Sequence, residues 1–309
     1  MSDKIAAVFP GQGAQRPGMG QDFCENNESA NKIYEEASNA INEDVKVLCF
    51  TENEKLNLTE FTQPAILTTE IAILTVLKEK YSFSPSLFAG HSLGEYSALV
   101  AAGVIPFSDA VKIVRKRGAL MQAAVPEGVG TMAALLIDDI EKTNFEKITA
   151  DSGAEVANYN SAGQIVISGK KEAMEKATEA LANAYPDMRI VMLPVSAPFH
   201  SSLMKDIEGE FIETLQQLEN KFDKSRCTSV LSNFTGDFHQ PDTLLKNLVA
   251  QISGSVKWIQ NMKVLIEASN EIIEVGPNKV LTKFFATMDC TVPAIINERS
   301  AKKRFAPES

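Results

Sequence analysis

The sequence predicts an α/β protein with a large domain built on a parallel sheet and a smaller inserted domain. Strand and helix patterns alternate along most of the 309 residues, as in proteins whose helices cover a parallel sheet. A serine lies in a glycine-bounded turn between a short apolar run and a helix-forming segment. One central region follows the order βαββαβ, and a second α/β stretch resumes after it. We therefore expect the large domain at residues 1–127 and 198–309, and the small domain at residues 128–197.

The composition excludes several classes of protein. With 44% apolar residues the chain can bury a sizeable core, and its net charge of −10 argues against nucleic acid and anionic membranes as partners. No apolar run reaches the roughly 18 residues that a membrane helix needs. The apolar run at residues 5–9 is too short for a signal peptide, so we expect a cytoplasmic protein. The four cysteines form no C-x-x-C pair, which predicts neither a metal site nor a disulfide framework.

A strand, a turn and a helix are predicted before the serine, and another helix is predicted after it. An apolar strand at residues 5–9 runs into a glycine-rich turn at residues 10–15. A helix is expected to open at Pro64, because proline favours the first helical turn, and its nearly uniform apolar surface predicts burial. Another helix is predicted at residues 108–124.

Residues 90–94 spell G-x-S-x-G, the pattern of a nucleophile elbow, in which a serine sits on a strained turn between a strand and a helix. Residues 86–89 supply the strand, and residues 95–102 supply a helix that stops at Gly103. The two glycines allow strand and helix to pass closely. This context favours Ser92 as a nucleophile in an α/β-hydrolase-like domain over an incidental serine in a turn.

The central region is typical of a ferredoxin-like domain, since its elements follow the order βαββαβ. We predict its strands at residues 131–137, 156–159, 164–168 and 189–194, and its helices at 140–149 and 171–185. The stretch that follows is predicted to contain helices at residues 202–219, 244–252 and 256–269, and strands at 228–232 and 271–275.

A serine hydroxyl is a weak nucleophile and needs a base within hydrogen-bond reach. His200 follows the last strand of the small domain, at its seam with the large one, where clefts form. His91 adjoins Ser92, but adjacent side chains leave the backbone in different directions. His239 lies in a polar, turn-like stretch and is expected to face solvent. We therefore favour His200 as the base over a purely structural role for it.

Arg117 lies in the middle of the apolar face of the helix predicted at residues 108–124. A buried guanidinium without a partner costs several kcal/mol. It therefore either pairs with an internal carboxylate or binds an anionic ligand through two parallel hydrogen bonds, and the residues alone support both equally. The glycine-rich turn lacks the usual phosphate-binding patterns, but it can point N–H groups at a developing oxyanion.

Five segments stand in order along the chain: Phe9-Pro10-Gly11-Gln12-Gly13-Ala14-Gln15, Gly90-His91-Ser92-Leu93-Gly94-Glu95-Tyr96, Arg117-Gly118 with Met121-Gln122, Gln164-Ile165-Val166-Ile167-Ser168-Gly169, and Val275-Gly276-Pro277. Together they resemble the malonyl-CoA:acyl-carrier-protein transacylases, the discrete enzymes of bacterial-type fatty acid synthesis. The resemblance spans nearly the whole chain. It departs at Ala14 and Asn278, where a serine and a glycine are common.

The resemblance implies a role for each candidate residue. Ser92 would be the acylated nucleophile, and His200 its general base and acid. The backbone N–H groups of Gln12 and Leu93 would form the oxyanion hole. Arg117 would hold the malonyl carboxylate, which decides between the two interpretations of its burial.

Two further features follow from the same resemblance. The main-chain carbonyl of Gln251 would orient the histidine, in keeping with the lack of an obvious triad aspartate. Leu93 and Phe199 resemble the residues of malonyl-selective rather than methylmalonyl-selective sites.

The implied reaction moves malonyl from CoA to Ser92, and then to the phosphopantetheine thiol of acyl carrier protein. Its partners would be malonyl-CoA and acyl carrier protein, and it needs no metal or other cofactor, because the CoA thioester is itself the substrate. We expect a monomer. The alternatives are a discrete trans-acting acyltransferase of a polyketide synthase, a serine thioesterase, and a non-catalytic carrier-binding protein.

Overall fold

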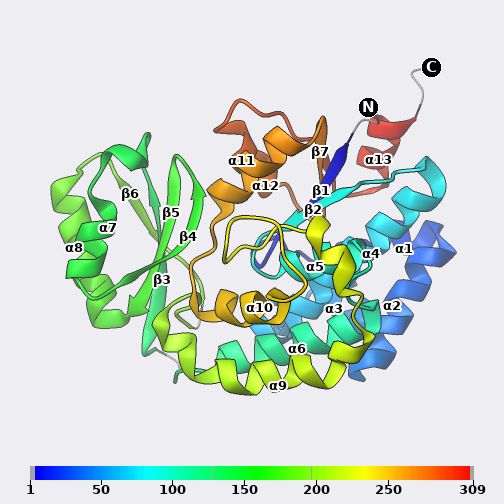
Figure 1. The fold of residues 1–309 in the computed structure, drawn as a ribbon, viewed down its shortest axis with the longest axis horizontal. Helices are drawn as coiled ribbons and strands as arrows, with labels where there is room; N and C mark the ends of the chain where they lie inside the picture. Colours follow the sequence, from blue (N-terminus) through cyan, green and yellow to red (C-terminus); the bar gives the residue numbers. More distant parts are fainter. Residues whose placement is uncertain (1–3, 127, 196, 307–309) are drawn as a thin grey trace.

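A parallel sheet lies at the centre of the computed structural model, which describes residues 4–126, 128–195 and 197–306 (Figure 1). Its strands are β1 (Ile5–Phe9), β2 (Leu87–Gly90), β7 (Glu271–Val275) and the short β8 (Ala294–Ile295). They stand in the order β2-β1-β7-β8, and all neighbours run parallel. The predicted parallel sheet is therefore confirmed, and the carboxyl ends of β1, β2 and β7 meet at one edge.

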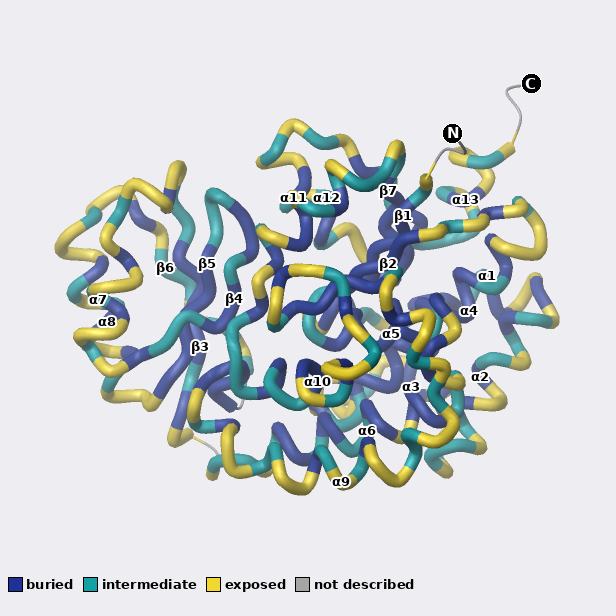
Figure 2. Tube along the Cα trace, viewed as in Figure 1, coloured by how far each residue is buried: buried dark blue, intermediate teal, exposed yellow. Residues whose placement is uncertain are grey.

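Helices cover both faces of this sheet. Ala7 and Phe9 of β1 pack in the core formed with α4 (Thr59–Tyr81), α5 (Gly94–Ala101) and α6 (Phe107–Ala123). Ala6 and Val8 face the opposite way, toward α11 (Trp258–Ala268) and α12 (Leu281–Ala286). Successive side chains of a strand point to opposite faces, so an apolar strand is buried on both sides. Figure 2 shows these strands and α5 as the buried centre of the molecule.

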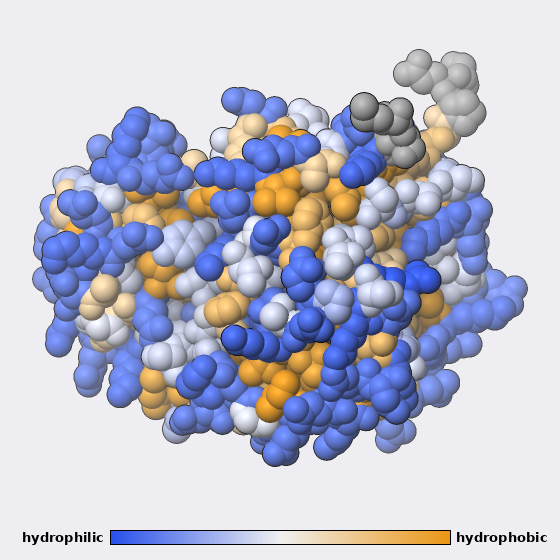
Figure 3. Space-filling model, in the orientation of Figure 1, coloured by the Kyte–Doolittle hydropathy of each residue, from blue (hydrophilic) through white to orange (hydrophobic). Residues whose placement is uncertain are grey.

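The remaining helices surround this core. The α-helices are α1 (Gln21–Asn26), α2 (Glu28–Ile41), α3 (Val45–Phe50), α9 (Glu208–Leu218), α10 (Leu244–Ser253) and α13 (Glu298–Phe305). Short 3₁₀ turns occupy Glu54–Asn57, Ile140–Lys142, Ser202–Ile207, Glu219–Lys221 and Lys224–Ser229. The face in Figure 3 is largely hydrophilic, and no helix in the described ranges has the length and apolarity to cross a membrane.

An antiparallel sheet lies at one end of the molecule (left in Figure 1). Its strands β3 (Gly130–Leu136), β4 (Glu155–Ser161), β5 (Gln164–Lys170) and β6 (Arg189–Met192) stand in the order β4-β5-β3-β6. Helices α7 (Phe145–Asp151) and α8 (Lys171–Ala184) pack on one face against Ala133 and Leu135. The other face, with Met132 and Ala134, joins the core of the parallel sheet.

The start of α4 corrects the expectation that Pro64 opens this helix. The helix begins at Thr59 and contains Pro64. Its first turn is held by tertiary packing, because Gly118 of α6 lies against it: a Cβ at Gly118 would come within 2.5 Å of the Thr59 carbonyl oxygen. The predicted burial of the helix is confirmed, since most of its residues are buried.

Residues 228–232 do not form the predicted strand. The chain forms a 3₁₀ turn over Lys224–Ser229, and Val230 pairs with Phe88 only as an isolated bridge, because the chain then turns back through a Leu231–Phe238 bridge. The helices predicted at 140–149 and 202–219 both begin with 3₁₀ turns instead, and α7 and α9 follow them. Residue 127, at the first predicted domain boundary, lies outside the described residues, as do residues 1–3 and 307–309.

Candidate active site

The serine lies where β2 passes into α5. Ser92 has a φ of 52°, in the left-handed region that side chains other than glycine avoid. A Cβ at Gly90 would overlap the carbonyl of Gly94, and a Cβ at Gly94 would overlap the carbonyl of Phe9. Both glycines are thus required by close backbone approach, and the predicted sequence of strand, elbow and helix is confirmed.

His200 follows strand β6 in the chain, and its side chain reaches Ser92. Its Nε2 lies 2.8 Å from the Ser92 hydroxyl, and its Nδ1 lies 2.8 Å from the main-chain carbonyl of Gln251 in α10. Because a carbonyl only accepts, Nδ1 carries the proton and Nε2 is left to accept the Ser92 hydroxyl proton. His200 also has a left-handed φ of 56°. The geometry therefore brings Ser92, His200 and Gln251 together as the sequence analysis expects.

The environment keeps His200 in the form that accepts a proton. Burial, and after it the charge of Arg117, lowers the pKa of His200 from 6.5 to about 3. Both causes disfavour the imidazolium. The imidazole is therefore neutral at pH 7.

The other two histidines lie elsewhere. His91 turns away from Ser92, and its Nε2 lies 2.7 Å from Oδ1 of Asn160 in β4. The expectation that His239 faces solvent is wrong: its side chain is fully buried, and its Nε2 lies 2.7 Å from Oε1 of Glu95. The polar stretch folds back through the bridge between residues 231 and 238, and Glu95 supplies the partner that makes this burial tolerable.

Arg117 is buried on α6, with 1% of its surface exposed. Its Nη1 donates to Oε1 of Gln63 at 2.9 Å. Its Nη2 donates to Oε1 of Gln251 at 2.8 Å and to the Ser92 hydroxyl at 3.1 Å, and its buried Nε has no partner. All three acceptors are neutral, and no carboxylate in the described residues forms an ion pair with Arg117. Glu95 is reached only through Gln251, whose amide nitrogen lies 2.7 Å from its carboxylate. This arrangement favours the anionic-ligand interpretation.

Sequence reasoning missed two groups that fix the site. Gln63 approaches Arg117 because Gly118 lets the start of α4 lie against α6. Asn233 accepts a hydrogen bond from the Ser92 N–H at 2.6 Å and donates to the Gly90 carbonyl at 2.8 Å. Each is a single polar residue whose partner is distant along the chain, so no local pattern marks it.

The glycine-rich turn packs on the elbow, since a Cβ at Gly11 would overlap the carbonyl of His91. Gln12 and Leu93 both line one cavity, and the N–H of neither is used in a hydrogen bond to another described residue. The cavity measures about 110 Å³. Its lining includes Gln12, Ser92, Leu93, Arg117, Phe199 and His200.

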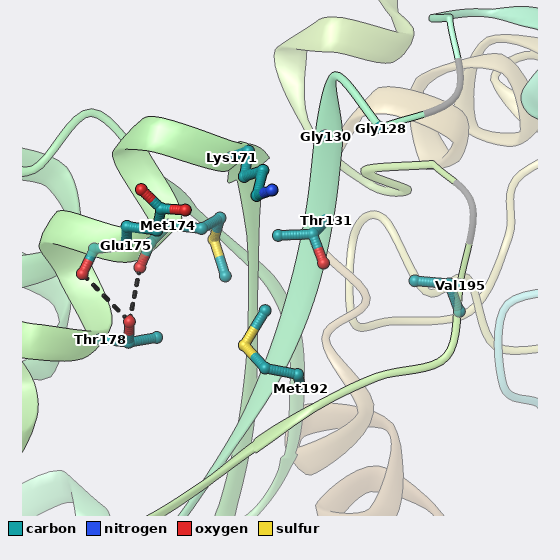
Figure 4. A pocket seen from close by; sticks show the side chains of 9 residues that line it. All are labelled: Gly128, Gly130, Thr131, Lys171, Met174, Glu175, Thr178, Met192 and Val195. Atoms are coloured by element: carbon teal, nitrogen blue, oxygen red, sulfur yellow. Dashed lines mark hydrogen bonds between the residues drawn. The ribbon is translucent and has the colours of Figure 1, made fainter.

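A larger cavity, of about 350 Å³, lies on the small domain between α8 and the ends of β3 and β6 (Figure 4). Its lining includes Lys171, Met174, Thr178 and Met192. The Thr178 hydroxyl bonds to main-chain carbonyls of its own helix, at 2.8 and 3.1 Å. Among the residues that the structure describes, no histidine, serine or cysteine lines this cavity.

Comparison with known proteins shows the family of the chain. The family described as acyl transferase domain matches residues 7–284. The chain is 43% identical over 285 residues to the malonyl CoA-acyl carrier protein transacylase of Staphylococcus aureus (strain MRSA252), covering 90% of each chain. The chain belongs to the acyl transferase family.

Solved structures of acyl transferases share the whole fold. The malonyl-CoA:acyl carrier protein transacylase of Xanthomonas oryzae pv. oryzae aligns with a TM-score of 0.92 and 34% identity, over 99% of this chain and 98% of that one. A malonyl transacylase in complex with a type II polyketide synthase acyl carrier protein aligns with a TM-score of 0.90 and 35% identity, over 98% and 99% of the two chains. The resemblance found from the five sequence segments is therefore confirmed.

Proposed function

We propose that this protein transfers malonyl from CoA to the phosphopantetheine thiol of acyl carrier protein, feeding fatty acid elongation. The observation that carries the proposal is the Ser92–His200 pair beside a buried Arg117 that has no ion-pair partner among the described residues. One chain supplies every group of the site, so we propose that it acts as a monomer. The thioester is itself the substrate, so the proposed reaction uses no metal or other cofactor.

In the first half-reaction, Nε2 of His200 takes the hydroxyl proton as Ser92 Oγ attacks the thioester carbonyl. The carbonyl oxygen becomes an oxyanion, which the unused N–H groups of Gln12 and Leu93 would stabilise. Collapse breaks the carbon–sulfur bond. His200 returns its proton to the sulfur of CoA, which leaves malonyl esterified to Ser92.

The second half-reaction reverses these steps with a different thiol. His200 takes the proton of the carrier's phosphopantetheine thiol, whose sulfur attacks the seryl ester. The same two N–H groups would stabilise the second oxyanion. Collapse breaks the ester bond, and His200 returns the proton to Ser92 Oγ. The main-chain carbonyl of Gln251 keeps the imidazole in the tautomer that both half-reactions need.

Arg117 would recognise the malonyl group through its free carboxylate. A guanidinium holds a carboxylate by parallel, charge-assisted hydrogen bonds, and here no internal carboxylate in the described residues competes for it. Because the charge of Arg117 contributes to the low pKa of His200, a bound carboxylate would also make His200 a stronger base. The preferred acyl group therefore both fits the site and activates it.

We also infer that residues 1–127 and 198–309 form one α/β-hydrolase-like domain, into which residues 128–197 insert as a ferredoxin-like domain. The parallel sheet with its serine elbow supports the first assignment. The element order βαββαβ and the strand order β4-β5-β3-β6 support the second.

Incubation with labelled malonyl-CoA, with and without acyl carrier protein, tests the proposed function. Intact-mass analysis should show a malonyl adduct that Ser92→Ala lacks, and the label should move to the carrier when it is added. Release of the label as free malonate at the same rate without carrier would instead identify a thioesterase. Faster labelling of a polyketide synthase carrier than of a fatty acid synthase carrier would favour the polyketide alternative. An adduct that persists in Ser92→Ala would contradict the assignment of the nucleophile.

A further inference from the structure

A second histidine lies beneath the active site, paired with a buried carboxylate. Glu95 on α5 and His239 are both fully buried. Oε1 of Glu95 lies 2.7 Å from Nε2 of His239. Its Oε2 accepts hydrogen bonds from the main-chain N–H of Asn233 at 2.9 Å and from the amide nitrogen of Gln251 at 2.7 Å. The carboxylate is thus held by three residues, two from the loop at the Leu231–Phe238 bridge and one from α10.

Both residues that share this carboxylate also hold the reacting groups. The side chain of Asn233 accepts from the Ser92 N–H, and the amide nitrogen of Gln251 donates to the Ser92 carbonyl at 3.0 Å. The Gln251 carbonyl fixes His200, and its side-chain oxygen accepts from Arg117. Nucleophile, base and guanidinium are each one hydrogen bond away from a residue that Glu95 holds.

The geometry also sets the protonation state of His239. Its Nδ1 is buried and has no hydrogen-bond partner in the described residues. An imidazolium would place a second N–H donor at this position without an acceptor, which is costly in the interior. A neutral ring with its proton on Nε2 satisfies Glu95 and leaves only a bare lone pair at Nδ1. Gln251 also links Glu95 to Arg117, since its side-chain oxygen accepts from Arg117 and its amide nitrogen donates to Glu95.

We propose that His239 is a positioning residue, a neutral hydrogen-bond donor that orients Glu95 and, through Gln251 and Asn233, holds Ser92, His200 and Arg117 in place. It touches no substrate. Only the malonyl readout of this inference rests on the proposed function. Loss of the donor would leave a buried carboxylate with one bond fewer and loosen all three reacting groups at once.

Two substitutions separate the donor from the bulk of the ring. In His239→Gln the amide nitrogen can take the place of Nε2, whereas His239→Leu keeps similar volume without a donor. We expect the leucine variant to lose about tenfold or more in the rate of Ser92 acylation by malonyl-CoA, and to discriminate less between malonyl and acetyl. We expect the glutamine variant to stay within about threefold of the unmodified protein.

The ratio of malonyl to acetyl acylation supplies a readout that a purely structural role would not move. Because Gln251 accepts from Arg117 and donates to Glu95, this ratio should fall in His239→Leu and stay in place in His239→Gln. Tyr34→Phe is the matched control. It removes a buried hydroxyl that bonds to Thr69 at 2.9 Å, and it lies outside this network. It should lower the melting temperature without changing this ratio.

Reaction of Ser92 with a serine-directed phosphonate probe repeats the measurement without malonyl. If the unmodified protein accepts the probe but forms no malonyl adduct, the proposed function fails, and the probe rates of the variants still decide the role of His239. Should the leucine variant not fold, His239→Asn, whose shorter amide does not reach Glu95, takes its place. Acylation at the unmodified rate in the donor-free variant, or equal losses in the glutamine and donor-free variants at equal stability, would overturn the proposal.

Discussion

The two cavities beside the antiparallel sheet differ in size and in chemistry, and the smaller of them holds the proposed reactive groups. The lining of the cavity of about 350 Å³ includes Met174, Met192 and Thr178, whose hydroxyl bonds within its own helix. The cavity of about 110 Å³ holds Ser92, His200 and Arg117, which come from three separate segments. Adjacent residues of β3 line the two, Thr131 the larger and Met132 the smaller, because alternate side chains of a strand face opposite ways.

The difference teaches that convergence of buried polar groups, and not volume, marks the reactive site. Each reacting group in the smaller cavity is held by residues distant in sequence, such as Gln63, Asn233 and Gln251. Substitutions there should therefore change the chemistry strongly. Substitutions at the larger cavity should change it little, although Val195 lines both.

Removal of the proposed base should have the largest effect. His200→Ala should slow acylation and transfer to the carrier by about a hundredfold or more, because one imidazole serves both half-reactions. Stopped-flow or rapid-quench measurement of each half-reaction checks this. His91→Ala is the matched control, since it removes another imidazole from the lining of the same cavity. A loss in His91→Ala as large as in His200→Ala would contradict the assignment of the base.

The pH dependence of acylation should reflect the burial of His200. With its pKa lowered to about 3, His200 stays neutral as the pH falls, and the base form is lost only as the pH approaches that value. We therefore expect kcat/KM for acylation at pH 5 to stay within about twofold of its value at pH 7. An ordinary pKa of 6.5 would instead predict a fall of about twenty-fivefold, which would show that burial does not control the base.

The contact between α4 and α6 should matter next. A Cβ in Gly118→Ala would lie 2.5 Å from the Thr59 carbonyl oxygen and 2.8 Å from Cα of Glu60, so the backbone must shift. We expect the free energy of unfolding to fall by about 1–3 kcal/mol, and malonyl transfer to fall by about tenfold as Gln63 moves from Arg117. Gly209→Ala is the control, because nothing lies within 4 Å of its added Cβ. Equal changes in unfolding free energy and in malonyl transfer for the two variants would show that the contact between α4 and α6 does not position Gln63.

The smallest effect is expected at the larger cavity. Met192 is 51% exposed and lines only that cavity. Met192→Lys should leave acylation by malonyl-CoA within about twofold, since an exposed position away from the site tolerates substitution. A tenfold loss in the same assay would mean that the larger cavity takes part in the reaction.

Local sequence patterns predicted part of this site. The two glycines around Ser92 indicated a tight turn, because a side chain at either position would overlap neighbouring backbone. Helical periodicity predicted the burial of Arg117. The burial of His239 and the contacts of Asn233 depend on chain reversals that leave no periodic signal. Residues 228–232 do not form the predicted strand for a similar reason, since Val230 pairs only with Phe88 of β2.

The pairing of Arg117 with the substrate carboxylate is the central claim, and one comparison tests it most directly. The kcat/KM values of Arg117→Ala for malonyl and for acetyl transfer are measured beside its melting temperature. We expect malonyl transfer to fall by at least about a hundredfold, because two charge-assisted hydrogen bonds are lost, and acetyl transfer to fall far less or to rise. Arg117→Lys should restore malonyl transfer only partly, since an ammonium cannot match the planar fork. Equal losses for both acyl groups in a destabilised protein would show that Arg117 holds the fold together and does not select the substrate.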